Sequence, residues 1–186
     1  AHQDKLEDRI ISSDSLDDDT EEKEEIQIPV PEQQHAIIVG YGRVGSELIR
    51  ILQEKQIPFV VIENEPYRAE KAQKLGIPII TGNAASEDVM HKANPATASM
   101  LLIASHQPFE EGAMINHVSK VNPGAIIVAR AETDAAVDYL LSQGAHGAVM
   151  EKKELAFSMM EMVMSGKRLT QRGLWPPVPV SADVEK

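Results

Sequence analysis

The sequence predicts a doubly wound, mostly parallel α/β sheet of about six strands, with helices on both of its faces. Short apolar segments rich in Ile and Val alternate with helical segments from residue 36 onward. The connections between these segments are short, and several helical segments end at a glycine, as at Gly76 and Gly144. Continuous apolar strands joined by short helical crossovers are typical of parallel sheets that are covered by helices.

The predicted elements alternate regularly along the chain. The expected strands are 36–40, 58–63, 77–81, 99–104, 125–130 and 146–150. The expected helices are 43–55, 66–75, 86–92, 109–121, 133–142 and 152–165. Sheets of this kind bind their ligands at the carboxyl ends of the strands, so the residues after each strand are the first candidates for a site.

The first strand runs directly into a Gly-x-Gly-x-x-Gly sequence at Gly40, Gly42 and Gly45. Gly40 permits a tight turn, Gly42 lets a phosphate approach the backbone, and Gly45 lets the next helix pack close to the strand. The helix then directs free N–H groups and the positive end of its dipole at the phosphate. This spacing predicts a Rossmann-like nucleotide site. The alternative is a fold that keeps the glycine packing without a ligand.

An acidic residue, Glu63, ends the second strand. An acid at this point of a dinucleotide-binding unit accepts hydrogen bonds from ribose hydroxyls. A carboxylate also repels a 2′-phosphate, so Glu63 favours NAD or an adenosine nucleotide over NADP.

Polar residues follow three further strands, and each has two interpretations. Asn83 either bonds to an adenine or ribose group or serves as a turn or cap residue. Ser105 either faces the ligand or caps a helix. Arg130 ends a buried strand and therefore requires a phosphate or a carboxylate partner.

Groups suited to catalysis are scarce. The chain has no cysteine, and its six histidines show no metal-ligand spacing. His106 is the only histidine at the carboxyl end of a predicted strand. A nicotinamide dehydrogenase also needs a substrate domain, for which we expect little room here. We therefore predict a binding or sensing module with no catalytic or metal-binding residues; the alternative is a small NAD-dependent oxidoreductase or a subunit of one.

Negative charge is concentrated near the N-terminus. Residues 1–33 hold twelve acidic and three basic residues, whereas the formal charge of the whole chain is −11. We expect 1–33 to be an acidic flexible linker, 34–166 the nucleotide-binding domain and 167–186 an extended tail. No basic stripe indicates a nucleic-acid partner, and the lack of cysteine is compatible with a reducing compartment.

The last predicted helix is apolar around much of its circumference and carries Met159, Met160, Met162 and Met164. A helix that is apolar nearly all round needs cover on more than one side. We expect its own sheet to cover one side and a second subunit to cover another, because methionine suits adaptable interfaces. The alternative is a core helix.

Several motifs together resemble a known family. They are the segment from His35 to Gly45 (HAIIVGYGRVG), Val61-Ile62-Glu63, Gly82-Asn83-Ala84, Ala129-Arg130-Ala131 and Gly144-Ala145. In this order they resemble the TrkA-N domain, also called the RCK or KTN domain. The likeness is strongest to the Kef-type and YbaL-type bacterial cation/proton antiporters of the CPA2 group. It covers residues 35–165.

The resemblance implies a set of nucleotide-binding residues. The glycine loop would contact the phosphates of NAD(H) or of an adenine nucleotide such as AMP or ATP, and Glu63 would hold the ribose. Asn83, where many family members carry Asp, and Ala84 would contact the adenosine. The full predicted set is Gly40, Tyr41, Gly42, Arg43, Val44, Gly45, Glu63, Asn64, Asn83, Ala84, Ser105 and Arg130.

The resemblance also implies a function. The domain would regulate a potassium/proton antiporter or a related cation transporter from the cytoplasmic face of the bacterial inner membrane. Its partners would be a second copy, through helix 152–166, and a transmembrane antiporter domain of the same full-length chain. Residues 1–33 would connect the two domains.

Overall fold

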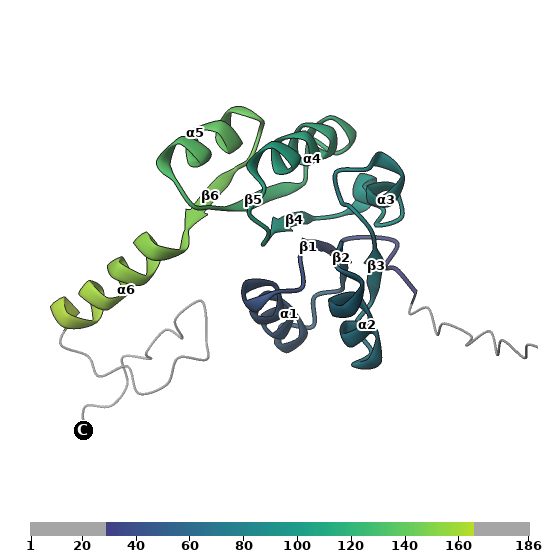
Figure 1. Cartoon of the computed structure of the whole chain (residues 1–186), viewed down its shortest axis with the longest axis horizontal. Helices are drawn as coiled ribbons and strands as arrows, with labels where there is room; N and C mark the ends of the chain where they lie inside the picture. The colour runs from purple at the N-terminus through teal and green to yellow at the C-terminus, as the bar shows by residue number, and fades with distance from the viewer. Residues whose placement is uncertain (1–28, 166–186) are drawn as a thin grey trace, which may run out of the picture.

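A computed structural model describes residues 29–165 of the chain as a six-stranded, all-parallel sheet flanked by helices (Figure 1). The strands are β1 (Ala36–Val39), β2 (Phe59–Glu63), β3 (Ile79–Thr81), β4 (Met100–Ile103), β5 (Ile126–Ala131) and β6 (Gly147–Met150). The helices are α1 (Arg43–Glu54), α2 (Pro66–Lys74), α3 (Glu87–His91), α4 (Pro108–Val121), α5 (Asp134–Ser142) and α6 (Glu151–Ser165). The predicted fold class is therefore confirmed.

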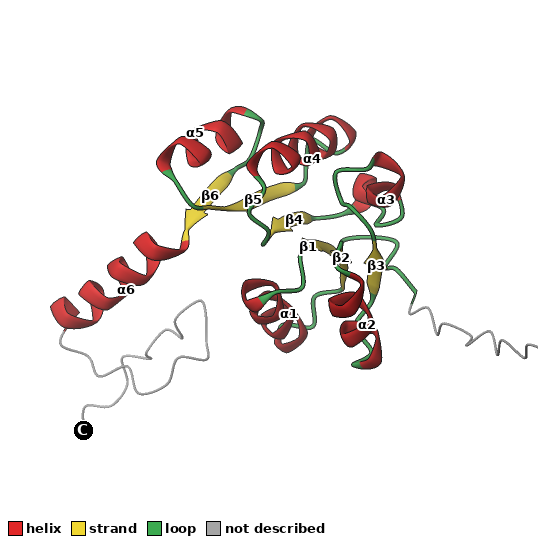
Figure 2. Cartoon of the chain, viewed as in Figure 1, coloured by secondary structure: helices red, strands yellow, loops and turns green. Residues whose placement is uncertain are grey.

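Strands and helices alternate along the described chain (Figure 2), and a short 3-10 helix, η1 (Pro95–Thr97), precedes β4. The predicted linker up to residue 28, the last residue of the predicted domain (166) and the predicted tail 167–186 lie outside the described residues. No helix within 29–165 combines the length and the apolar character that a membrane crossing requires.

The strand order is β3-β2-β1-β4-β5-β6. The chain moves outward from β1 to β3, then returns to place β4 on the other side of β1. The loops after β1 and β4 therefore lead away in opposite directions at the carboxyl ends of these strands, and we call the region between them the crevice. This switch point is where open α/β sheets bind their ligands.

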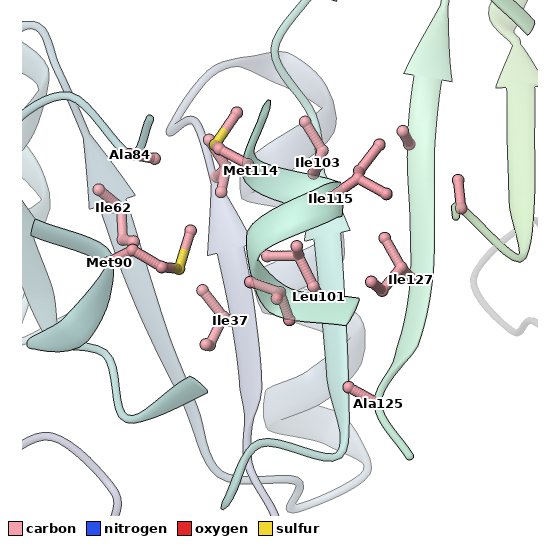
Figure 3. Packing of buried hydrophobic residues seen from close by; sticks show 14 of the residues in the cluster. Ile37, Ile62, Ala84, Met90, Leu101, Ile103, Met114, Ile115, Ala125 and Ile127 are labelled. Atoms are coloured by element: carbon pink, nitrogen blue, oxygen red, sulfur yellow. The ribbon is translucent and has the colours of Figure 1, made fainter. Parts of the chain in front are cut away.

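Successive residues of the central strands point to opposite faces of the sheet and build two hydrophobic clusters. Ile37 and Leu101 belong to the cluster that packs under α3 and α4, where Met90 and Ile115 contribute (Figure 3). On the other face, α1 and α2 cover β1 and β2, in a cluster that includes Ile38, Val61, Ile49, Leu52 and Ala72.

The β5–β6 half of this second face is not covered by the described residues. Ile126 and Val149 point to this face and are 55% and 42% exposed. β5 and β6 therefore have described helices on one side only, whereas β1, β2 and β3 have them on both sides.

The expectation that α6 packs on its own sheet is wrong. None of its residues is buried, and the helix projects away from the sheet (Figure 1). β6 ends at Met150 and α6 begins at Glu151, so no connecting residues allow the chain to turn back. The large apolar side chains that it leaves exposed are Leu155, Phe157, Met159, Met160, Val163 and Met164.

The segment that enters β1 is attached to η1. The Thr97 hydroxyl donates to the carbonyl of Glu32 at 2.5 Å, and the Asn94 amide donates to the carbonyl of Pro31 at 3.2 Å. Residues 31 and 32, which were expected to belong to the linker, therefore contact the folded domain.

Candidate functional site

The three glycines of the loop after β1 have different environments. Gly40 has φ of +98°, which disfavours side chains. A Cβ on Gly45 would lie 2.0 Å from the carbonyl oxygen of Gly40, so only glycine allows α1 to approach the loop this closely. A Cβ on Gly42 would meet no heavy atom within 4 Å. Gly45 thus serves packing, whereas the space beside Gly42 is open to a group that approaches the backbone.

The first turn of α1 is suited to bind an anion. Gly42 is the N-cap, and the first intrahelical hydrogen bond runs from Ser46 N–H to the Gly42 carbonyl at 2.9 Å. The N–H groups of Arg43, Val44 and Gly45 precede this bond and carry the positive end of the helix dipole. The turn contains no acidic residue, and the described part of the chain supplies no carboxylate partner for Arg43. These features fit a phosphate group.

Glu63 holds two loops of the crevice together. Its Oε2 accepts a hydrogen bond from the Tyr41 N–H at 2.6 Å, and its Oε1 accepts one from the Glu65 N–H at 2.8 Å. The side chain is 5% exposed, and the Arg68 guanidinium lies 4.0 Å away. Sequence reasoning missed these backbone bonds. Each carboxylate oxygen can accept more than one hydrogen bond, so this arrangement leaves acceptor capacity for a ribose hydroxyl.

The loop after β3 is shaped by a turn. The Asn83 Oδ1 accepts a hydrogen bond from the Ala85 N–H at 2.8 Å, which is the turn role considered for it. The Ala84 methyl group belongs to the hydrophobic core, so its backbone is the part that borders the crevice. Asn64, after β2, is exposed.

Ser105 is bound to a buried acid that sequence reasoning missed. Its hydroxyl donates to Oε1 of Glu111 at 3.0 Å, and the Gln107 N–H donates to the same oxygen at 2.9 Å. Glu111 is fully buried, and this burial raises the pKa of its carboxyl group despite the opposing hydrogen bonds. Its Oε2 finds no partner among residues 29–165. The spacing of residues in α4 could have indicated this buried acid, because Glu111 lies on the same buried face of the helix as Ile115 and Val118.

Arg130 has a carboxylate partner in the structure. Its Nη2 donates to Glu151 at 2.6 Å, and its Nη1 donates to the Nδ1 of His106 at 3.3 Å. Its Nε is buried without a partner in the described chain. His106, the one histidine considered as an acid or base, is therefore engaged with a cation.

The crevice therefore brings together the glycine loop, Glu63, the loop at Asn83 and the Ser105–Glu111 pair. Within 29–165, no group of three or more His, Cys, Asp and Glu side chains is placed to hold a metal ion. Backbone N–H groups, a carboxylate and open space at Gly42 are features suited to the phosphate and ribose of a nucleotide.

Comparisons with known proteins concern the sequence and the fold of the chain. The model of the TrkA-N domain family matches residues 36–151. The chain is 37% identical over 161 residues to the putative cation/proton antiporter YbaL of Escherichia coli (strain K12). This match covers 85% of the present chain and 29% of YbaL, so the chain spans less than a third of that relative.

Solved structures of related domains have a similar fold. The crystal structure of the TrkA-N domain of inner membrane protein YbaL from Escherichia coli matches with a TM-score of 0.67 at 37% identity, over 70% of this chain and 97% of that one. The Kef CTD of Shewanella denitrificans, in an AMP-bound form, matches with a TM-score of 0.60 at 24% identity, over 72% and 82% of the two chains. The GsuK channel bound to NAD matches with a TM-score of 0.58 at 20% identity, over 67% and 22%. The last two similarities concern the fold.

Proposed function

The chain belongs to the TrkA-N domain family, and on this premise we propose that it is a regulatory nucleotide-binding domain, not an enzyme, that gates a potassium/proton antiporter or a related cation transporter. The observation that carries the proposal is the first turn of α1. Its unbonded N–H groups lie beside the open space at Gly42, and Glu63 ends the neighbouring strand. A phosphate and a ribose fit this combination.

The proposed ligand is NAD(H) or an adenine nucleotide such as AMP or ATP. The backbone from Gly40 through Tyr41 to Gly45 would bind its phosphates, Glu63 and Asn64 its ribose, and Asn83 and Ala84 its adenosine. Ser105 and Arg130 would lie toward the other half of the ligand. The AMP-bound form of the Kef CTD and the NAD-bound form of GsuK support this class of ligand.

We also propose a protein partner, which is another copy of this chain that would bind through α6. Six large apolar side chains of α6 are exposed, and the uncovered face of β5 and β6 exposes Ile126 and Val149. Exposed apolar side chains in this number mark an interaction site. A second copy supplies both surfaces, so the α6 of each subunit could cover the open sheet face of the other.

The transporter role follows from the relatives. The chain matches 29% of YbaL, a putative cation/proton antiporter, which supports a transmembrane domain in the same full-length chain and a place for this domain on the cytoplasmic face of the membrane. A ligand that binds one arrangement of the dimer more tightly shifts the population toward it. Residues 1–33 would pass that shift to the transporter.

Calorimetric titration with AMP, ATP, NAD⁺, NADH and NADPH tests the nucleotide function. We expect saturable binding of an adenine nucleotide or NAD(H), and weaker binding of NADPH because Glu63 repels its 2′-phosphate. Gly42→Asp places a carboxylate in the open space at the α1 N-terminus, and this variant should fold and lose binding. If no nucleotide binds the folded wild-type protein, the proposal is wrong and the domain is a dimerisation scaffold.

A further inference from the structure

α6 is joined to the sheet at its first turn. β6 ends at Met150 and α6 begins at Glu151, so no loop residue separates the strand from the helix. None of the α6 residues is buried, so packing against its own domain does not fix the direction of the helix. Within residues 29–165, this direction therefore depends on the backbone at the junction and on the contacts of the first turn.

Two ion pairs connect the first turn of α6 to neighbouring elements. The Glu151 Oε2 lies 2.6 Å from the Nη2 of Arg130, which belongs to β5. The Lys153 Nζ lies 2.5 Å from the Oδ1 of Asp134, the first residue of α5. A single contact would let the helix swing about one point, whereas two contacts on different elements define its direction.

Ion pairs of this kind are weak, but here they have little to compete with. Asp134 and Lys153 are largely exposed, whereas the Arg130 side chain is 18% exposed, so water screens its pair less. Lys153 lowers the pKa of the Asp134 carboxyl group through a hydrogen bond and through its charge. Because α6 buries no side chain on its own domain, a small electrostatic preference is enough to select one direction among several.

The direction of α6 matters because the helix is long. It has 15 residues, and a helix of this size is about 22 Å long. A change of about 20° in its direction therefore moves its last turn by about 7 Å. A displacement of this size changes which apolar side chains of α6 can meet a second copy.

We propose that Glu151 and Lys153 are positioning residues for the dimer: their ion pairs with Arg130 and Asp134 set the direction in which α6 leaves the sheet. The proposal rests on the proposed dimer contact through α6 and adds the residues that determine its geometry. In the proposed function, a ligand shifts the dimer from one arrangement to another. The two ion pairs define one of these arrangements.

The test is the distance between spin labels on α5 and α6, measured by double electron–electron resonance. The chain has no cysteine, so Ser142→Cys and Met164→Cys, both at exposed positions, carry the only labels. Labelled protein is diluted with an excess of unlabelled protein, so that distances within one chain dominate. We expect one narrow distribution. Adding Glu151→Gln and Lys153→Met should broaden or shift it by about 5 Å or more.

Matched variants separate the ion pairs from other effects. Glu154→Gln removes a negative charge from the same turn of α6, but Glu154 has no basic partner within 29–165, so the distribution should not change. Lys153→Asp should broaden the distribution. Combining it with Asp134→Lys should narrow the distribution again, because the pair is restored with its charges reversed. Circular dichroism of each variant checks that the helix content is kept.

The inference is wrong if the distribution is broad before the ion pairs are removed, or if Glu151→Gln with Lys153→Met leaves it narrow. It is also wrong if Glu154→Gln changes the distribution equally, or if the reversed pair does not narrow it. If the double variant loses helix content, the reversed pair decides. None of these outcomes affects the proposed function, which calorimetry and sedimentation of the wild-type chain test separately. A wild-type chain of single-chain mass would overturn the role in a dimer together with the proposed dimer contact.

Discussion

The backbone N–H of Tyr41 donates a hydrogen bond of 2.6 Å to Oε2 of Glu63, which joins the glycine loop after β1 to the end of β2. The other oxygen of Glu63 accepts from the Glu65 N–H at 2.8 Å. Because the carboxylate is 5% exposed, its backbone partners satisfy it largely in place of water. The acid considered for ribose binding therefore fixes the position of the glycine loop relative to the end of β2.

Replacing Glu63 should cost stability even without a ligand. Glu63→Ala leaves the N–H groups of Tyr41 and Glu65 without their acceptor, and we expect a loss of about 2–3 kcal/mol in the free energy of unfolding. Urea titration followed by circular dichroism measures it. Glu47→Gln, at an exposed position of α1, is the control and should be nearly neutral. An unchanged unfolding midpoint in Glu63→Ala would show that the two bonds do not shape the loop.

Two glycines three residues apart should respond differently to a methyl group. Gly45→Ala places a Cβ 2.0 Å from the Gly40 carbonyl oxygen, a backbone atom that cannot move aside, so we expect a loss of more than about 3 kcal/mol or no folding. Gly42→Ala enters open space and should cost about 1 kcal/mol or less, chiefly as a poorer N-cap, while it weakens nucleotide binding. Thermal unfolding and calorimetry of both variants check this contrast. Equal stability losses would contradict it.

Much of the fold was predictable because local signals agreed with one another. Apolar runs indicated the strands, and glycines after the helices indicated their ends. β3 is shorter than predicted because it begins at Ile79, after Pro78, which has no N–H to donate to a neighbouring strand. The 3-10 helix η1 was missed because three residues carry no periodicity.

The sequence indicated which strand ends carry the candidate site residues, but not which side chains those residues contact. Sequence reasoning indicated that Arg130 needs a partner, but the carboxylate that it contacts comes from Glu151, 21 residues away. Ser105 likewise depends on Glu111, on a different element. For α6, the apolar pattern showed that cover is needed but not which surface provides it. Such partners depend on the tertiary arrangement, which local patterns do not encode.

Glu111 should make stability depend on pH. Burial raises the pKa of its carboxyl group in the folded protein above the reference value of 4.5, so the folded state binds its proton more tightly than the unfolded state. The free energy of unfolding should therefore fall as pH rises from about 4.5 through the folded-state pKa. Between the unfolded-state and folded-state pKa values, the fall should be about 1.4 kcal/mol for each pH unit. Glu111→Gln should remove this component. The measurement is the difference in unfolding free energy between the two proteins from pH 4 upward. A difference that does not vary with pH would contradict the prediction.

The exposed face of α6 should determine the oligomeric state. Phe157 is 67% exposed on α6, and Phe109 is 84% exposed on α4. The same substitution at both positions therefore distinguishes a phenylalanine ring that lies in an interface from one that is only exposed to solvent. If α6 binds a second copy, sedimentation should give twice the chain mass of 20.4 kDa for the wild-type protein and for Phe109→Glu. A symmetric dimer contains Phe157 twice, so Phe157→Glu removes two buried rings from the proposed interface. At about 1.5–3 kcal/mol for each buried ring, it should raise the dissociation constant at least about a hundredfold. A wild-type protein of single-chain mass, or equal dissociation by both variants, would rule out α6 as the dimer interface.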